Sequence, residues 1–131
     1  MKAVQFRVAR PTDQMDKLIT FYEQGLGLSR VGEFHDHNGY DGVMFGIPGT
    51  PYHVEFTSHK DGSPCIAQTK DQLLVFYIEE MRDIVSITAR MKSIGYDPCT
   101  PENPYWEDKG ITFEDADGFR VVLMNTGGLS Y

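Results

Sequence analysis

The sequence predicts an α+β fold made of two tandem modules, each with the element order β-α-β-β-β. Each half opens with a short stretch of alternating apolar and polar residues, typical of a half-buried strand, and continues with apolar residues at helical spacing. The two halves also correspond at an offset of 68 residues, which pairs Ile19 with Ile87, Gly27 with Gly95, Gly42 with Gly110 and Phe45 with Phe113. An internal duplication explains both observations.

The first module is expected at residues 1–60. Val4, Phe6 and Val8 alternate with polar or small residues, so we expect a strand with these side chains against the helix that follows. Thr12 or Asp13 can cap that helix, whose apolar positions are Met15, Leu18, Ile19, Tyr22 and Leu26. Three more strands are expected at 28–33, 42–47 and 52–57, separated by turn-rich segments.

The second module is expected at residues 71–131, after a polar linker at 58–70. Its first strand is expected at 72–78 and its helix at 81–94, where Gly95 ends it. Strands are then expected at 96–100, 110–114 and 119–124. The pair Asp117-Gly118 predicts a hairpin between the last two.

Composition narrows the classes of partner. The 131 residues, 40% of them hydrophobic, fit one soluble domain, and the net charge of −7 disfavours nucleic acid and anionic membranes as partners. No apolar run is long enough for a signal peptide or a membrane span. Cys65 and Cys99 suggest neither a disulfide framework nor a zinc site, so we expect a cytoplasmic protein.

The strand faces indicate where a site would lie. Because alternate side chains point to opposite faces of a strand, Gln5, Arg7, His53 and Glu55 are expected together on the face away from the helix of the first module. In the second module both faces of the first and last strands are mostly apolar. One of these faces therefore needs a cover, which is either the other half of the chain or a ligand.

Two motifs add a family resemblance. The segment Phe21-Tyr22-Glu23-Gln24-Gly25-Leu26-Gly27-Leu28 and the ending Phe113-Glu114-Asp115-Ala116-Asp117-Gly118-Phe119 resemble the vicinal oxygen chelate superfamily. That superfamily includes glyoxalase I, the bleomycin and fosfomycin resistance proteins, and the extradiol dioxygenases. The stretches 9–12, 38–46 and 103–106 resemble an uncharacterised bacterial glyoxalase-like subgroup.

The resemblance implies a curved mixed sheet around one cavity, and it implies homodimers in many members. Members that use a metal place one ligand in the first and last strand of each module, which corresponds to Ala3, Glu55, Gln72 and Val122 here. Ala3 and Val122 cannot coordinate a metal, so the sequence does not favour the family's divalent metal. If a metal binds nevertheless, we expect Glu55 and His53 to hold it.

These considerations give a set of candidate site residues. Glu55 and His53 are the candidate catalytic pair, and the alternative is that Glu55 forms a structural ion pair with Arg7. Tyr105 and Trp106 are either pocket wall or core. Phe45, Phe76 and Met124 are either ligand lining or core. The remaining candidate ligand-binding positions are Gln5, Arg7, Gln72 and Val122.

The leading functional hypothesis is a small-molecule-binding protein of the glyoxalase and bleomycin-resistance type, with a mixed polar and aromatic cavity. An alternative is a glyoxalase-like lyase or isomerase, or another enzyme, that uses Glu55 and His53 with a metal. A third is a partner-binding domain whose cavity has been lost. The sequence does not identify the ligand.

Overall fold

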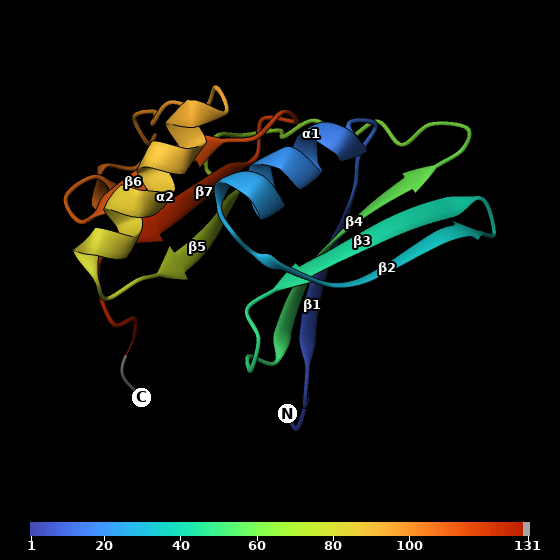
Figure 1. The fold of residues 1–131 in the computed structure, drawn as a ribbon, viewed down its shortest axis with the longest axis horizontal. Helices are drawn as coiled ribbons and strands as arrows, with labels where there is room; N and C mark the ends of the chain where they lie inside the picture. The colour runs from blue at the N-terminus through green and yellow to red at the C-terminus, as the bar shows by residue number, and fades with distance from the viewer. Residues whose placement is uncertain (130–131) are drawn as a thin grey trace. The chain divides into compact units, whose positions relative to one another are not determined.

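The computed structural model describes residues 1–129 of the chain (Figure 1). The chain divides into two compact units, Met1–Cys65 and Ile66–Tyr131. The boundary falls inside the polar segment 58–70. Within the described residues, no helix has the length and apolar character needed to cross a membrane.

The first unit holds a four-stranded mixed sheet and one helical segment. Its elements are β1 (Phe6–Pro11), α1 (Met15–Ile19), the π-helical η1 (Thr20–Gly25), β2 (Ser29–His37), β3 (Tyr40–Gly46) and β4 (Tyr52–His59). The strand order is β1-β4-β3-β2; β1 runs parallel to β4, and the other pairs are antiparallel. The element order of the predicted first module is therefore confirmed. β2 extends past residue 33 because Asn38 and Gly39, both with positive φ, form a tight hairpin to β3.

The core of the first unit lies between the sheet and the helical segment. Phe21, Tyr22, Phe45 and Phe56 are fully buried, and the rings of Tyr22 and Phe56 are 4.7 Å apart. The Arg10 guanidinium lies over the Phe56 ring at 5.0 Å, and its Nη2 donates to the Tyr22 hydroxyl at 3.2 Å. Arg10 therefore takes part in the packing between helix and sheet.

The edge strand β1 differs from the sequence prediction. Val4, Phe6 and Val8 were expected to pack against the helix, but 89%, 66% and 39% of their respective surfaces are exposed. The register pairs Val8 with Val54, so the predicted face of Val8 is correct. The predicted burial of Val8 is wrong, because an edge strand has a neighbouring strand on one side only.

The second unit repeats the plan with a three-stranded sheet. Its elements are β5 (Leu73–Tyr77), α2 (Met81–Ser93), the 3-10 helix η2 (Pro104–Trp106), β6 (Gly110–Glu114) and β7 (Arg120–Met124), in the strand order β5-β7-β6. The strand predicted at 96–100 is wrong, because only a single bridge joins Cys99 to Thr112. Pro98 and Pro101 flank that bridge and have no N–H to extend a ladder.

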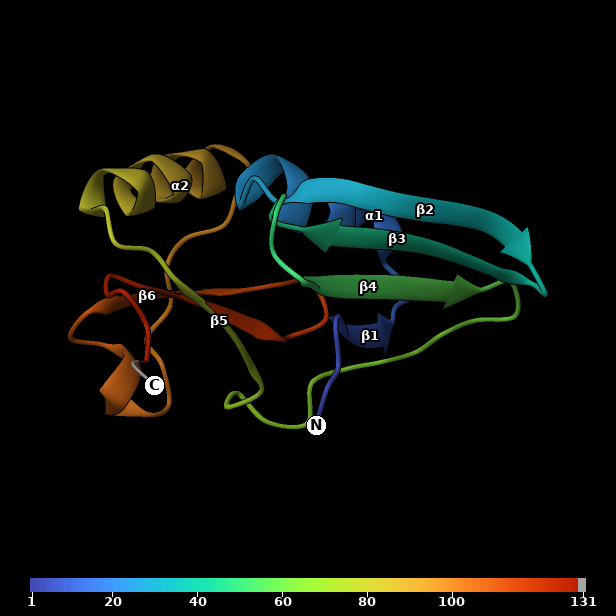
Figure 2. The ribbon, with the colours of Figure 1, turned by 90° about the horizontal axis from the view of Figure 1, so that it is seen from below.

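Two layers cover the sheet of the second unit. In Figure 2, α2 lies on one side of this sheet and the segment with η2 lies on the other. A Cβ built on Gly110 would point at the Trp106 carbonyl oxygen and the Met124 sulfur, so Met124 belongs to the η2 side. The alternate residues Phe113, Val121 and Leu123 face α2 and are buried. As the central strand, β7 is buried on both faces.

The two units share the details that a duplication implies. Gly27 and Gly95 both adopt positive φ, 81° and 93°, where the helical segments end. Phe45 and Phe113 are both fully buried. In each unit the first strand pairs parallel with the last strand.

The predicted Asp117-Gly118 turn is present between β6 and β7. The buried Asp115 carboxylate accepts hydrogen bonds from the backbone N–H groups of Asp117 and Phe119, at 2.9 and 3.0 Å. Gly118 has a φ of 87°, which a residue with a side chain adopts only at a cost. This side-chain to backbone network fixes the register of the last two strands.

Candidate functional site

Three charged or titratable side chains lie on the face of the first sheet that points away from the helix. We call Arg7, His53 and Glu55 the polar face. Arg7 is the register partner of His53, and its Nη1 lies 3.5 Å from the Glu55 Oε2. Their side chains differ in exposure, 40% for Arg7 and 12% for Glu55. The structure thus brings together three of the four residues that the sequence analysis expected on this face.

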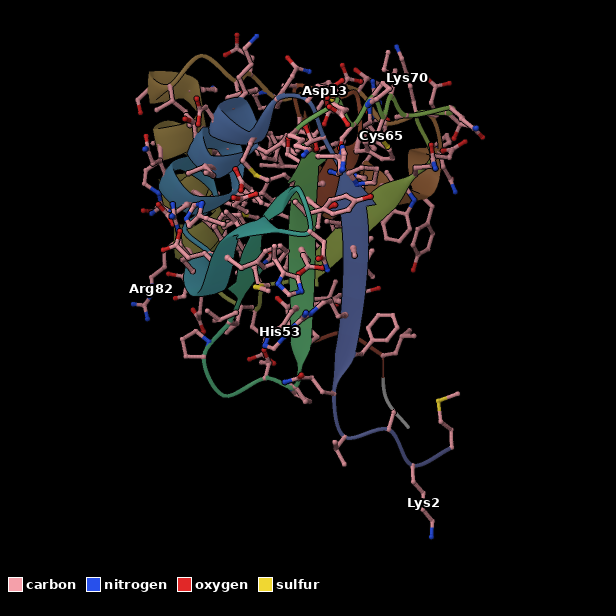
Figure 3. The ribbon with its side chains drawn as sticks, turned by 90° about the vertical axis from the view of Figure 1, so that its right-hand side faces the viewer. Lys2, Asp13, His53, Cys65, Lys70 and Arg82 are labelled. Carbon is pink, nitrogen blue, oxygen red and sulfur yellow. The ribbon has the colours of Figure 1, made fainter. Side chains whose placement is uncertain are left out.

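His53 lies at the start of β4 (Figure 3), and Gly46 makes room for it. A Cβ at Gly46 would approach the His53 Cδ2 to 3.3 Å, so the imidazole packs close to the glycine backbone. The His53 Nδ1 is buried and has no hydrogen-bond partner in the described chain. A buried ring nitrogen without a partner carries a desolvation cost, which the fold bears at this position.

Apolar side chains border the polar face. Met44 is the register partner of Glu55, and its sulfur would lie 3.0 Å from a Cβ at Gly32. The ring of Phe34 covers Gly42 so closely that a Cβ there would clash with it. Sequence reasoning missed Met44 and Phe34 as neighbours of this surface. The available signal was the alternation of Gly42, Met44 and Gly46, which leaves room on one face of β3.

Two other predicted residues of the first module lie elsewhere. Gln5 is exposed and precedes β1, so no strand pairing holds it beside Glu55. Phe45 is fully buried on the opposite, helix-facing side of the sheet, with its ring 6.2 Å from that of Phe56. Of the two alternatives given for Phe45, the structure places it in the core.

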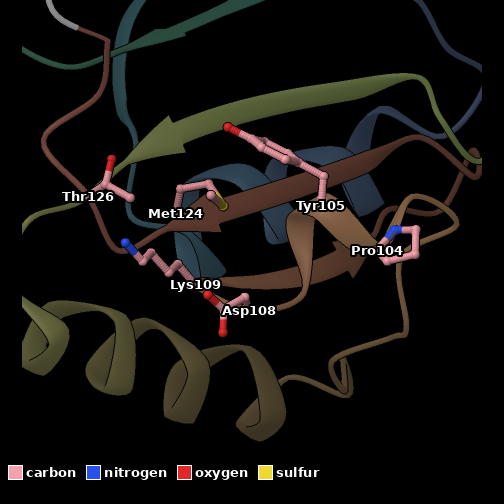
Figure 4. A pocket seen from close by; sticks show the side chains of 6 residues that line it. All are labelled: Pro104, Tyr105, Asp108, Lys109, Met124 and Thr126. Atoms are coloured by element: carbon pink, nitrogen blue, oxygen red, sulfur yellow. The ribbon is translucent and has the colours of Figure 1, made fainter.

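In the second unit, a pocket of about 400 Å³ opens beside η2 (Figure 4). Its lining residues are Pro104, Tyr105, Asp108, Lys109, Met124 and Thr126. The Asn103 Oδ1 accepts a hydrogen bond from the Tyr105 N–H at 3.0 Å and so caps the short helix that presents the ring. The Tyr105 and Trp106 rings meet edge to face, 4.8 Å apart.

The walls of this pocket combine apolar and charged groups. Met124 is buried, whereas Tyr105 is 66% exposed, so the ring stands as an open wall above a thioether. Asp108 and Lys109 place both signs of charge among the lining residues. Such a mixture suits an amphipathic organic molecule better than a bare ion.

The other predicted residues of the second module have structural positions. The Gln72 Oε1 accepts hydrogen bonds from the N–H groups of Gln68 and Thr69, at 2.8 and 3.3 Å, which closes the turn before β5. Phe76 is the register partner of Leu123 and so lies on the face toward α2. Val122 is fully buried in the central strand. None of these three lines the pocket beside η2.

The residues present do not fit the family's metal. Glu55 and Val122 occupy equivalent positions, because they pair with Met44 and Thr112, which correspond at the offset of 68. Ala3 and Gln72 precede the first strands, β1 and β5. At the start of these strands, the residues that share a face with Glu55 and Val122 are Arg7 and Leu73. Arg7, Leu73 and Val122 cannot coordinate a metal ion. The Glu55 carboxylate is therefore the single metal donor among the four positions. Residues 1–129 also contain no group of three His, Cys, Asp or Glu side chains that could hold a metal ion.

The cysteines give no sign of an activated nucleophile. Neither forms a disulfide. Burial raises the pKa of the Cys99 thiol, and the nearby Arg120 only partly opposes this. A thiol with a raised pKa is protonated at neutral pH and therefore reacts slowly.

Two protein-family models match the two halves of the chain. The model of the YycE-like N-terminal domain matches residues 6–57, and that of the YycE-like C-terminal domain matches residues 71–125. The chain belongs to the YycE-like family. The uncharacterised protein YycE of Bacillus subtilis (strain 168) is 51% identical to it over 129 residues, which cover 98% of this chain and 93% of that protein.

Solved structures extend the likeness to the glyoxalase fold. The crystal structure of the Bacillus subtilis YycE protein, whose function is unknown, is 51% identical and superposes with a TM-score of 0.88, covering 98% of this chain and 93% of that one. Leishmania major glyoxalase I is 15% identical with a TM-score of 0.72, over 95% of this chain and 87% of that one. TnmS3, an antibiotic-binding protein of Streptomyces sp. CB03234, is 16% identical with a TM-score of 0.64, over 95% of each chain. These likenesses confirm the predicted vicinal oxygen chelate fold.

Proposed function

We propose that this chain is a small-molecule-binding protein whose ligand enters the pocket beside η2. The observation that carries the proposal is the pocket itself, about 400 Å³ in volume and lined by an exposed aromatic ring, a thioether and two charged side chains. That volume lies within the range of ordinary ligand sites. The fold adds support, because TnmS3, which has the same fold, is an antibiotic-binding protein.

The lining defines the kind of ligand. The Tyr105 ring and the Met124 sulfur suit a planar or aromatic group, since both make favourable contacts with π systems. Lys109 and Asp108 suit polar substituents at the rim of the same molecule. A ligand with one flat apolar part and at least one charged or hydrogen-bonding group meets both requirements.

Thermal-shift screening against aromatic metabolites and antibiotics tests the proposal. For a ligand that raises the melting temperature, we expect quenching of Trp106, the only tryptophan, whose ring touches Tyr105. Tyr105→Ala should weaken binding about tenfold or more, as loss of a stacking residue does. Tyr40→Ala, which removes another exposed tyrosine from the first unit, is the matched control. Equal affinities in the two variants would contradict the assignment of this pocket.

An enzymatic role is the second candidate, and the polar face favours it. Glu55 is mostly buried beside Arg7, and the His53 Nδ1 has no partner, so a carboxylate base and a proton-carrying imidazole lie on one face. Such an enzyme would be a glyoxalase-like lyase or isomerase, and any metal that assists it would have to be held by Glu55 and His53 rather than by the family's four ligand positions. Turnover of a candidate substrate that depends on an added divalent metal and is lost in Glu55→Gln would favour this role over simple binding. Stabilisation by neither metals nor organic ligands would favour a partner-binding domain.

Cellular location and assembly complete the proposal. We propose a cytoplasmic protein, supported by its two unpaired thiols, which fit a reducing compartment. We also propose a homodimer, supported by the exposed Phe6 and Val8 on the edge strand β1. The net charge of −7 does not suit nucleic acid or an anionic membrane. Sedimentation of the wild type and of Phe6→Glu tests the dimer, because the new charge should shift a β1-mediated dimer to monomer.

A further inference from the structure

We propose that the polar face of the first unit binds a small zwitterion with an apolar side chain, as found in α-amino acids. The ligand carboxylate would contact Arg7, its ammonium would contact Glu55, and His53 would supply a third polar contact. The proposal extends the proposed function, which assigns a different pocket in the other unit. The two can fail separately, because they involve different residues.

Arg7 has most of its binding capacity unused. A guanidinium carries several N–H donors, and the described chain gives Arg7 a single partner, the Glu55 Oε2, at 3.5 Å. That distance is at the outer limit of a hydrogen bond. With 40% of its side chain exposed, Arg7 can reach a carboxylate and form the two parallel hydrogen bonds that this pairing favours.

The Glu55 carboxylate has few hydrogen-bond donors around it. Its side chain is only 12% exposed, and its one hydrogen bond in the described chain is the long contact from Arg7. A largely buried carboxylate is costly unless several donors surround it. The ammonium of a zwitterion would add a charged donor on the side that Arg7 does not cover.

The charge balance selects a zwitterion over a simple ion. Arg7 and Glu55 carry opposite charges and lie side by side, so an anion attracted by one is repelled by the other, and the same holds for a cation. A ligand with both charges on neighbouring atoms can pair with both at once. His53 lies on the same face as this pair, as the register partner of Arg7, and its ring is the third polar group beside the two charges.

The neighbouring residues define the rest of the ligand. Met44 is the register partner of Glu55, and Phe34 lies over Gly42 next along the strand. These side chains border the ion pair with apolar surface. An aliphatic or aromatic side chain on the ligand would therefore gain contacts that a polar one would not.

The fold itself does not require these charges. In the second unit, Leu73 and Val122 occupy the positions that correspond to Arg7 and Glu55, with the same strand pairing. The same backbone plan thus accepts apolar residues there. The second unit has an ion pair of its own on this face, between Arg120 and Glu114 at 3.1 Å, which is shorter than the Arg7–Glu55 contact of 3.5 Å. Charges at the positions of Arg7 and Glu55 are therefore not needed for folding, and their long contact leaves both groups able to pair with a ligand.

Calorimetric titration with three related probes tests the proposal. L-Leucine carries both charges, isocaproate keeps the carboxylate without the amine, and isoamylamine keeps the amine without the carboxylate. We expect L-leucine, or L-methionine or L-phenylalanine in its place, to bind with a dissociation constant of about 1 mM or tighter. Each single-charge probe should bind at least about tenfold more weakly. If none of the three amino acids binds, or if isocaproate or isoamylamine binds as well as leucine, the proposal is wrong.

Variants identify the surface. Arg7→Gln and Glu55→Gln should each reduce the affinity for the amino acid about tenfold or more. Arg30→Gln is the matched control, because it removes the same charge from the opposite face of the same sheet, where Arg30 pairs with Glu23. Circular-dichroism melting confirms that each variant is folded. Equal losses in Arg7→Gln and Arg30→Gln would assign the effect to net charge, because both variants remove one positive charge, and no loss in Arg7→Gln would exclude this surface.

A further comparison separates this proposal from the proposed function. Tyr105→Ala should leave amino-acid binding unchanged, because Tyr105 lies in the pocket of the second unit. Loss of amino-acid binding in Tyr105→Ala but not in Arg7→Gln would instead place the amino acid in that pocket and overturn the assignment to the polar face.

Discussion

Replacing Gly110 with alanine should disrupt the pocket beside η2 and destabilise the protein. Gly110 begins β6, and a Cβ at this position would overlap the Trp106 carbonyl oxygen and lie 2.8 Å from the Met124 sulfur. The first contact is more than about 1 Å too short for van der Waals packing. Because that atom belongs to the backbone, rotating a side chain cannot relieve the clash, and the η2 segment must move.

The size of the effect follows from two opposing contributions. Overpacking a tight site costs about 1–3 kcal/mol, and a backbone clash belongs at the upper end. Alanine has a lower chain entropy than glycine in the unfolded state, which stabilises the folded state by roughly 0.4–1 kcal/mol. We therefore expect the free energy of unfolding to fall by about 2 kcal/mol, which lowers the melting temperature by roughly 7 °C for a chain of this length.

Urea unfolding followed by circular dichroism measures this change, and two other glycines serve as controls. At Gly32, the nearest atom to the added Cβ is the flexible Met44 sulfur at 3.0 Å, so Gly32→Ala should change the stability by less than about 1 kcal/mol. At Gly42, the clash is with the Phe34 ring, a side chain that can rotate, so the loss should be intermediate. If Gly110→Ala is as stable as Gly32→Ala and still binds ligand, the reasoning about η2 is refuted.

Three further predictions concern single side chains. Glu55→Gln should alter ligand affinity but change the free energy of unfolding by less than about 1 kcal/mol, because its partner Arg7 is 40% exposed; loss of cooperative unfolding would show a structural role instead. Asp115→Ala should cost about 2–4 kcal/mol in chemical unfolding, because two N–H groups of the β6–β7 turn lose their acceptor; a loss below about 1 kcal/mol would contradict this. Burial raises the pKa of the Cys99 thiol above its ordinary value of 9.0, so the protonated form stabilises the fold fully below pH 9, and this contribution is lost as the pH rises through the raised pKa. Cys99 in a Cys65→Ser background should accordingly react more slowly with a disulfide reagent in the native state than in urea, and equal rates would count against it.

Much of the fold can be predicted from local patterns. Alternating apolar residues predicted β1, β5 and β7, and helical spacing followed by Gly95 predicted α2 nearly to the residue. The pair Asp117-Gly118 predicted the last turn, which the Asp115 carboxylate stabilises. These features depend on residues within a few positions of one another, so their signals are complete in the sequence.

The candidate site was predictable only in part. Arg7, His53 and Glu55 were expected on one face, because the face of a strand residue follows from its parity. Phe45 follows the same rule but lies on the helix-facing side, where its burial against Phe56 decides its role. The predicted strand at 96–100 failed because prolines limit its pairing to Cys99.

The sequence by itself determined the βαβββ order of the first module, the duplicated plan in which a strand and a helix precede the later strands, the faces of the strands and the membership of a glyoxalase-like fold. Only the tertiary structure decided that Phe6 and Val8 are exposed, that His53 packs against Gly46, and that η2 and Met124 enclose a pocket. The physical reason is the range of the interactions. Periodicity and turn chemistry act between near neighbours, whereas burial and cavity shape depend on which distant segments pack together, and no local pattern records that choice.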